Sequence, residues 1–172
     1  MSECEAKCEN KKIIIDTDIG DDIDDAFALS MLANCSAQIL GVTTVYKNSE
    51  ERARIAAYLL GKWGISCPVA AGQDYPISEP MKVLDFERLC SDGRPHISHL
   101  LPEMERTDYS GMSAADLILE SARTYPGQVT LLALGPMTNL AQACRQNPAV
   151  FDQLGEILSL IHISEPTRLQ LI

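Results

Sequence analysis

Residues 13–26 have the sequence IIIDTDIGDDIDDA, and this stretch is the most informative part of the chain for its fold. Three consecutive isoleucines between lysines and aspartates are typical of a buried parallel strand. Residues 24–33 then follow a helical pattern, with acidic residues in the first turn where the helix dipole favours them. The stretch therefore predicts a strand, a turn rich in carboxylates and a helix.

Strands and helices alternate along the rest of the chain. Further strands are expected at residues 38–45, 67–71 and 128–134, and helices at residues 50–63, 113–124 and 137–145. This order predicts an α/β fold, a Rossmann-like, open, mostly parallel sheet flanked by helices. Ligands of such sheets bind beyond the carboxyl ends of the strands, which here are residues 16–25, 43–48 and 134–139.

The ends of the chain differ in character from its middle. Residues 1–12 are polar and are expected to be a disordered leader before a domain at residues 13–157. Residues 73–110 carry prolines and scattered charges, which predicts a functional flap. Residues 158–168 (LSLIHISEPTR) resemble the translated end of a transposase sequencing adapter, which predicts an artefactual tail at residues 158–172. A natural strand and turn is the alternative for this tail.

Composition excludes several classes of partner. The 172 residues carry a formal net charge of -10, which repels nucleic-acid backbones and anionic membranes. No stretch approaches the roughly 18 apolar residues of a membrane span. The polar start lacks the apolar core of a secretory signal, so a cytoplasmic location with reduced cysteines is expected.

The acidic turn is the strongest candidate for chemistry. Six carboxylates fall within ten positions: Asp16, Asp18, Asp21, Asp22, Asp24 and Asp25. They repel one another unless a cation or hydrogen-bond donors lie among them, and Gly20 allows close approach of the backbone. Oxygen ligands in this density predict a site for a hard cation such as Ca²⁺. A solvated acidic turn is the alternative.

Two other acidic motifs fit less well. An EF-hand loop needs a glutamate at its twelfth position, which counted from Asp16 is Phe27. Phosphatases of the haloacid dehalogenase type also place Asp-x-Asp after a strand, but their usual Thr or Ser two residues later is Gly20 here. The phosphatase is therefore a runner-up.

Three blocks of sequence together resemble the nucleoside hydrolases, the inosine-uridine preferring nucleoside N-ribohydrolase family. Residues 16–26 resemble the family signature Asp-x-Asp-x-Gly followed by Asp-Asp-Ala, with two additional residues between its halves. Residues 42–48 (VTTVYKN) resemble the second family block, and residues 132–141 (LALGPMTNLA) resemble the third. Their order over residues 13–157 implies the N-terminal part of a nucleoside hydrolase fold.

The resemblance implies a calcium site with named ligands. Asp18 would bind Ca²⁺ and act as the general base toward the attacking water. Asp25 would be a second metal ligand, and Leu134 would offer its backbone carbonyl. Asp16 would support these ligands through hydrogen bonds.

The resemblance also implies contacts with the substrate. Asp24 would hold a ribose hydroxyl, and Asn48 would contact the sugar side of the pocket. Because of the two additional residues, Asp21 and Asp22 are rival candidates for the roles of Asp24 and Asp25. Ala26 favours the latter pair, since an alanine follows it as in the family.

The implied reaction is the hydrolysis of a ribonucleoside to ribose and free base, and the implied assembly is a dimer or tetramer. In the family, further ligands come from a C-terminal half that no block here resembles, so this chain by itself could be inactive. A non-catalytic calcium- or ribose-binding fragment is the main alternative. His96 and His99 are candidates for contact with the base, and the preference for purine or pyrimidine is left open. Thr138 and Asn139 are expected to cap a helix rather than to contact substrate.

Overall fold

The fold is a parallel sheet of five strands in the order β3-β2-β1-β4-β5, as expected for an α/β protein. It is seen in a computed structural model, which describes residues 10–20, 22–77, 102–104 and 106–160. The strands are β1 (Lys12–Thr17), β2 (Gln38–Thr44), β3 (Val69–Ala71), β4 (Val129–Ala133) and β5 (Glu156–Ser159).

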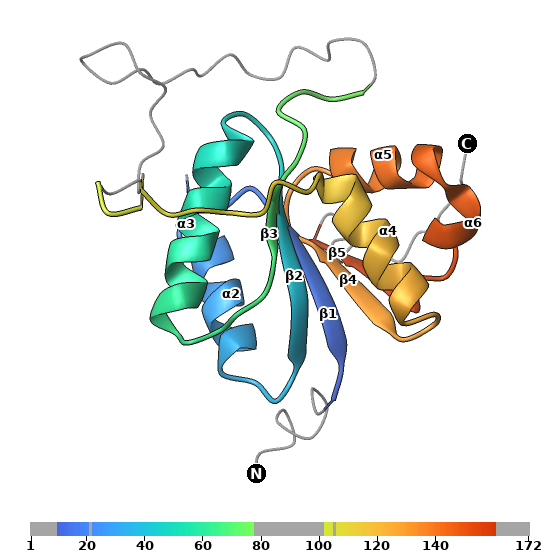
Figure 1. Ribbon diagram of the computed structural model, residues 1–172, viewed down its shortest axis with the longest axis horizontal. Coiled ribbons are helices and arrows are strands. Elements are labelled where there is room, and N and C mark those ends of the chain that lie inside the picture. The colour runs from blue at the N-terminus through green and yellow to red at the C-terminus, as the bar shows by residue number, and fades with distance from the viewer. Residues whose placement is uncertain (1–9, 21, 78–101, 105, 161–172) are drawn as a thin grey trace.

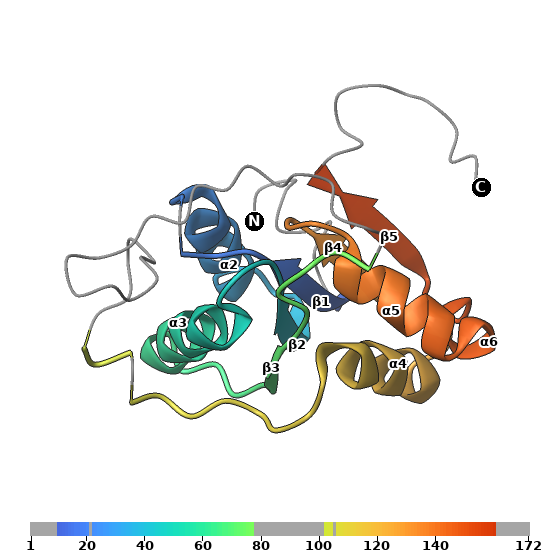
Figure 2. The same ribbon diagram turned by 90° about the horizontal axis from the view of Figure 1, so that it is seen from above.

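Helices cover both faces of this sheet, as Figures 1 and 2 show. One face carries α2 (Asp24–Ala33) and α3 (Ser49–Lys62). The other carries α4 (Ala114–Thr124), α5 (Thr138–Gln146) and the short α6 (Pro148–Phe151). The result is a sandwich of three layers.

The isoleucine run of β1 explains why both faces need cover. Successive side chains of a strand point to opposite faces. Ile13 and Ile15 belong to the apolar core shared with α2 and α3, whereas Ile14 belongs to the core shared with α4 and α5. All three are at most 5% exposed. Between Lys12 and Asp16, this central strand is buried on both sides and has no polar position.

Most predicted elements are present within a residue or two of their expected bounds. Ser113 caps α4, because its side chain accepts a hydrogen bond from the Asp116 N–H at 3.2 Å. Two elements, α6 and β5, were not expected as such. β5 includes Leu158 and Ser159, which the sequence assigns to the tail. Residues 1–9, 78–101 and 161–172 lie outside the described residues, so the leader and most of the flap and tail stay predictions.

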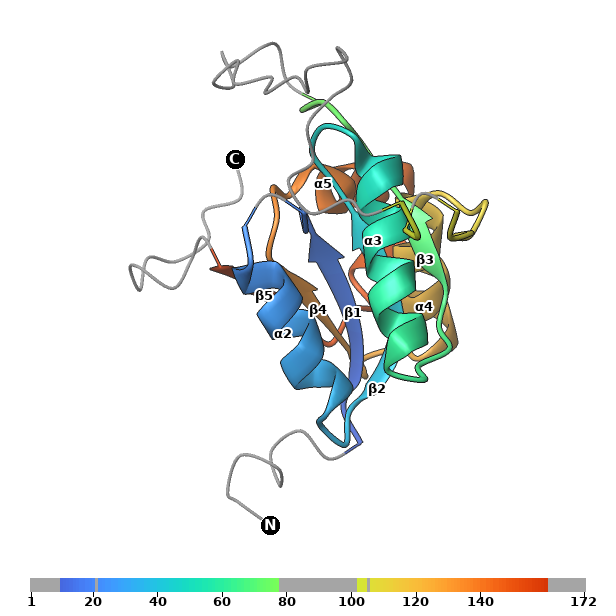
Figure 3. The same ribbon diagram turned by 90° about the vertical axis from the view of Figure 1, so that its left-hand side faces the viewer.

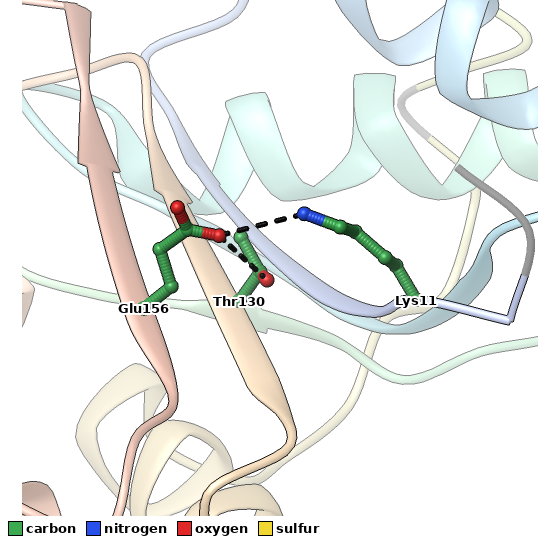
Figure 4. Close-up of polar contacts among 3 residues, drawn as sticks. All are labelled: Lys11, Thr130 and Glu156. Atoms are coloured by element: carbon green, nitrogen blue, oxygen red, sulfur yellow. Dashed lines mark hydrogen bonds and ion pairs between the residues drawn. The ribbon is translucent and has the colours of Figure 1, made fainter. Parts of the chain in front are cut away.

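Polar contacts near the amino ends of the strands join β5 to β4 and to Lys11, the residue before β1 (Figure 4). Glu156 accepts a hydrogen bond from the Thr130 hydroxyl at 3.4 Å and pairs with Lys11 at 3.5 Å. Both charged side chains are about half exposed, so this ion pair contributes little to stability. No helix within the described segments is long and apolar enough to cross a membrane.

The carboxyl ends of the strands meet at one edge of the sheet, the upper edge in Figure 3. β1 lies between β2 and β4, and its register pairs Asp16 with Thr43 on one side and with Ala133 on the other. The segments that follow these strands therefore converge, as the parallel topology predicts.

Candidate functional site

The site begins where β1 changes from apolar to polar residues. Because side chains alternate along a strand, Asp16 and Thr17 point to opposite faces. Asp16 turns toward α5 and hydrogen bonds to Asn139, and Thr17 turns toward α2 and hydrogen bonds to Asp25. One strand end thus connects the helical layers on both faces.

Asp16 is fully buried in a small polar network. Its Oδ1 accepts hydrogen bonds from the Thr43 hydroxyl at 2.5 Å and from Asn139 Nδ2 at 2.7 Å. Its Oδ2 is buried and has no hydrogen-bond partner among the described residues. Burial raises the pKa of Asp16 to about 7; the charges of Asp18 and Asp25 add to this, and the two hydrogen bonds oppose it.

Asn139 does not cap α5, so the capping prediction is wrong for this residue. The N-cap position is Met137, which makes no side-chain capping bond. Asn139 instead donates to Asp16 and to the carbonyl of Thr44 at 2.9 Å, and its Oδ1 accepts from the Gln73 N–H at 2.9 Å. It is 1% exposed and joins β1, β2 and the segment after β3.

Asp18 and Asp25 lie together on the α2 side. Asp25 Oδ2 accepts hydrogen bonds from the Thr17 hydroxyl at 2.5 Å and from the Asp18 N–H at 3.1 Å. Burial and the Asp25 charge raise the pKa of Asp18 to about 6, against the opposing charge of Arg52. Burial also raises the pKa of Asp25, and the Thr17 hydrogen bond opposes that rise.

The other aspartates of the turn lie differently. Asp24 and Asp22 are exposed, and Asp21 lies outside the described residues. Asp25 is 7% exposed and turns into the cluster from the first turn of α2. The geometry therefore favours Asp25 over Asp22 as the partner of Asp18, and it leaves Asp24 beside the cluster on the surface.

The loop after β2 has an unusual backbone. Tyr46, Lys47 and Asn48 all have positive φ, at 69°, 34° and 57°. The N–H groups of Tyr46 and Lys47 donate to the carbonyls of Gln73 and Asp74 at 2.8 and 3.0 Å. Asn48 is half-buried and occupies the N-cap position of α3 without a side-chain capping bond.

The turn after β4 approaches Asp18 closely. The Leu134 N–H donates to the carbonyl of Asp16 at 2.7 Å. A Cβ on Gly135 would lie 3.0 Å from Asp18 N and 3.1 Å from Asp18 Oδ1. Leu134 and Gly135 therefore follow β4 directly past the end of β1, where the sequence places the third family block.

The oxygen atoms at this edge fit part of a calcium shell. Ca²⁺ takes six to eight oxygen ligands, including carboxylates and backbone carbonyls. The carboxylates of Asp18 and Asp25 are of this hard-donor type, and their raised pKa values reflect crowding and burial that a cation would relieve. Within the described ranges no group of three or more His, Cys, Asp or Glu side chains is placed to hold a metal. The remaining ligands would have to be carbonyls, water or substrate hydroxyls.

The sequence pattern predicts no site role for several residues that build this edge: Thr17, Thr43, Arg52 and Asn139. Thr43 could have been found from the parallel register, which places it opposite Asp16. Arg52 and Asn139 lie in helices, and Thr17 contacts Asp25 of α2, so these contacts depend on the phase of helices, which the sequence pattern alone does not determine. His96 and His99 lie outside the described residues.

Comparison with known proteins identifies the family of the chain. Residues 13–160 match the family described as inosine-uridine preferring nucleoside hydrolase. The chain is 36% identical over 163 residues to uridine nucleosidase 1 of Arabidopsis thaliana, covering 88% of this chain and 45% of that protein.

Solved structures show the same likeness. A plant nucleoside hydrolase superposes with a TM-score of 0.67 and 29% identity, over 87% of this chain and 47% of that one. A purine-preferring ribonucleoside hydrolase from Gardnerella vaginalis gives a TM-score of 0.68 and 27% identity, over 87% and 48%. The chain spans about half the length of the relatives it matches. By the match over residues 13–160, the chain belongs to the inosine-uridine preferring nucleoside hydrolase family.

Proposed function

We propose that this chain carries the calcium- and ribose-binding part of a hydrolase that cleaves the N-glycosidic bond of ribonucleosides. The observation that carries the proposal is the pairing of Asp18 with Asp25 at the carboxyl end of β1, in a chain of this family. The products would be ribose and a free base.

The reaction explains what such a site must do. Cleavage of a glycosidic bond passes through an oxocarbenium-like sugar, with positive charge developing at the anomeric carbon. When bound, Ca²⁺ would supply a fixed point for sugar hydroxyls and would lower the pKa of water. The acidic residues of the chain would place negative potential beside the developing positive charge.

The residues of the chain have separate roles in this proposal. Asp18 would accept the proton of the attacking water, a contribution of roughly 10²–10⁴-fold in rate. Burial and the Asp25 charge raise the pKa of Asp18 in the chain without a cation, and a bound Ca²⁺ would oppose that rise and favour the ionised form that a general base requires. Asp24, exposed beside Asp25, would accept a hydrogen bond from a ribose hydroxyl. Asn48 would face the sugar from the loop after β2.

The substrate class is a ribonucleoside, and the base is not assigned. Relatives are named for uridine and for purine preference, so the family alone does not choose between them. A dimer or tetramer and a cytoplasmic location stay predictions. The phosphatase alternative has no support in the family match.

The test is release of reducing sugar from inosine and from uridine by the 172-residue chain, with CaCl₂ or with EGTA. We expect calcium-dependent release that is lost in Asp18→Asn. Asp22→Asn is the matched control, because it removes an exposed carboxylate of the same turn and should retain the native rate. Release that is equal in EGTA, or equal in Asp18→Asn, would contradict the proposal.

A non-catalytic calcium- or ribose-binding fragment is the second candidate. It is favoured by the described residues, among which no group of three or more His, Cys, Asp or Glu side chains is placed to hold a metal. Calcium binding that is lost in Asp18→Asn without any release of sugar from either nucleoside would support this candidate over the enzyme.

A further inference from the structure

Arg52 is a buried cation at the start of α3, and only 2% of its surface is exposed. A buried guanidinium is costly unless its N–H groups are hydrogen bonded. Its Nη1 donates to the carbonyls of Asp18 and, at 3.0 Å, Ile19. Its Nε donates to the carbonyls of Tyr46 and Lys47 at 2.7 and 2.9 Å. One side chain therefore joins the loop after β1 to the loop after β2.

Both loops carry residues of the candidate site. The loop after β1 begins with Asp18, and the loop after β2 ends with Asn48. The second loop is held in the left-handed region over three consecutive residues other than glycine, from Tyr46 to Asn48, which is an unfavourable conformation for L residues. It persists only where neighbouring groups fix it. Arg52 binds two of its carbonyls, while Gln73 and Asp74 bind two of its N–H groups.

We propose that Arg52 is a positioning residue that fixes the Asp18 loop and the Asn48 loop relative to each other. We call this connection of the two loops by Arg52 the clamp. The roles of Asp18 and Asn48 in the site rest on the proposed function, but the clamp does not. Lysine could not replace arginine in this role. The planar guanidinium donates to one loop from Nε and to the other from Nη1, whereas lysine has a single ammonium nitrogen.

Arg54 provides a matched control on the same helix. It donates from Nη1 to the carbonyl of Thr107 at 3.2 Å, and its guanidinium lies 5.2 Å from the centre of the Tyr109 ring. These contacts are with the segment before α4 rather than with the loops of the site. Arg52→Lys and Arg54→Lys make the same chemical change in two places.

The experiment has two readouts on the full chain. The first is Ca²⁺ affinity by titration calorimetry, with CaCl₂ as the probe. The second is amide hydrogen exchange by NMR, in EGTA, at Asp18, Tyr46 and Lys47, whose N–H groups are hydrogen bonded. Arg52→Lys should weaken Ca²⁺ binding by about tenfold or more, as loss of a residue that orients metal ligands typically does. It should also speed exchange in both loops and leave exchange in α4 unchanged. Arg54→Lys should change neither the Ca²⁺ affinity nor the exchange rates of the two loops.

The outcomes separate the two proposals. If the native chain binds no Ca²⁺, the proposed metal site is wrong. The amide exchange rates of Arg52→Lys in EGTA would still test the role of Arg52. Native exchange rates in both loops of Arg52→Lys would overturn the clamp. If Arg52→Lys does not fold, Arg52→Gln is measured in its place. Loss of fold in both variants would also overturn the assignment, because Arg52 would then be a general core residue.

Discussion

Asn139 Nδ2 lies 2.7 Å from Asp16 Oδ1, a buried hydrogen bond between residues 123 positions apart. It fastens the first turn of α5 to the carboxyl end of β1. Since Asn139 also binds the Thr44 carbonyl and the Gln73 N–H, three segments of the site edge depend on this one amide.

Asn139→Ala should lower the free energy of unfolding by about 1–3 kcal/mol, because it leaves buried polar groups without partners. Asn34→Ala is the control: Asn34 is exposed and its amide donates to the carbonyl of Ser30 at 2.8 Å. Its replacement should change stability by less than about 0.5 kcal/mol. Urea unfolding of both variants measures the difference, and equal stability of the two would contradict the role given to Asn139.

Two glycines should respond to alanine with opposite signs. A Cβ on Gly72 would lie 2.2 Å from Asn139 Oδ1 and 2.5 Å from the Thr44 carbonyl oxygen, so Gly72→Ala should destabilise the fold by roughly 1–3 kcal/mol. Gly61 lies inside α3 with nothing within 4 Å of a Cβ, so Gly61→Ala should stabilise by roughly 0.5–1 kcal/mol. Thermal unfolding of both variants checks the signs, and a stabilising Gly72→Ala would be inconsistent with this packing.

The buried Asp16 predicts how stability changes with pH in EGTA. Its pKa is about 7 in the folded chain against 3.8 for the ordinary group, so the folded state holds this proton more tightly. The contribution of Asp16 is therefore fully present below about pH 4 and is lost as pH rises toward 7.

The measurement is the difference in unfolding free energy between the native chain and Asp16→Asn, followed from pH 4 to pH 8. The native chain should lose stability relative to the variant as pH rises. A difference that stays flat, or that grows in favour of the native chain, would show that folding does not raise the pKa of Asp16.

The sequence predicts the layout of this edge because each signal is local. The isoleucine run and the aspartates after it determine where β1 ends, and the alternation of strands and helices brings the three segments to one edge. Asp16, Asp18 and Asp25 were all expected at the site, and the structure places them together. The family match covers these same segments.

Contacts that depend on three-dimensional register could not be predicted in the same way. Asparagine is a common residue at helix N-caps, and only the phase of α5 turns Asn139 inward toward Asp16. Arg52 lies in a helix rich in charges, where an arginine is usually solvated, and its burial follows from the path of two loops. Residues 46–48 adopt the left-handed conformation although none of them is glycine, so the sequence gives no signal of it.

We propose that Asp18 and Asp25 hold Ca²⁺, and calorimetric titration of CaCl₂ into the EGTA-treated and desalted chain measures this binding. We expect one site in the native chain, loss of binding in Asp18→Asn, and native affinity in Asp22→Asn. At calcium concentrations about 100 times the dissociation constant, the fold should also gain about 2.7 kcal/mol. Absence of binding in the native chain, or unchanged binding in Asp18→Asn, would show that these two aspartates do not form a calcium site.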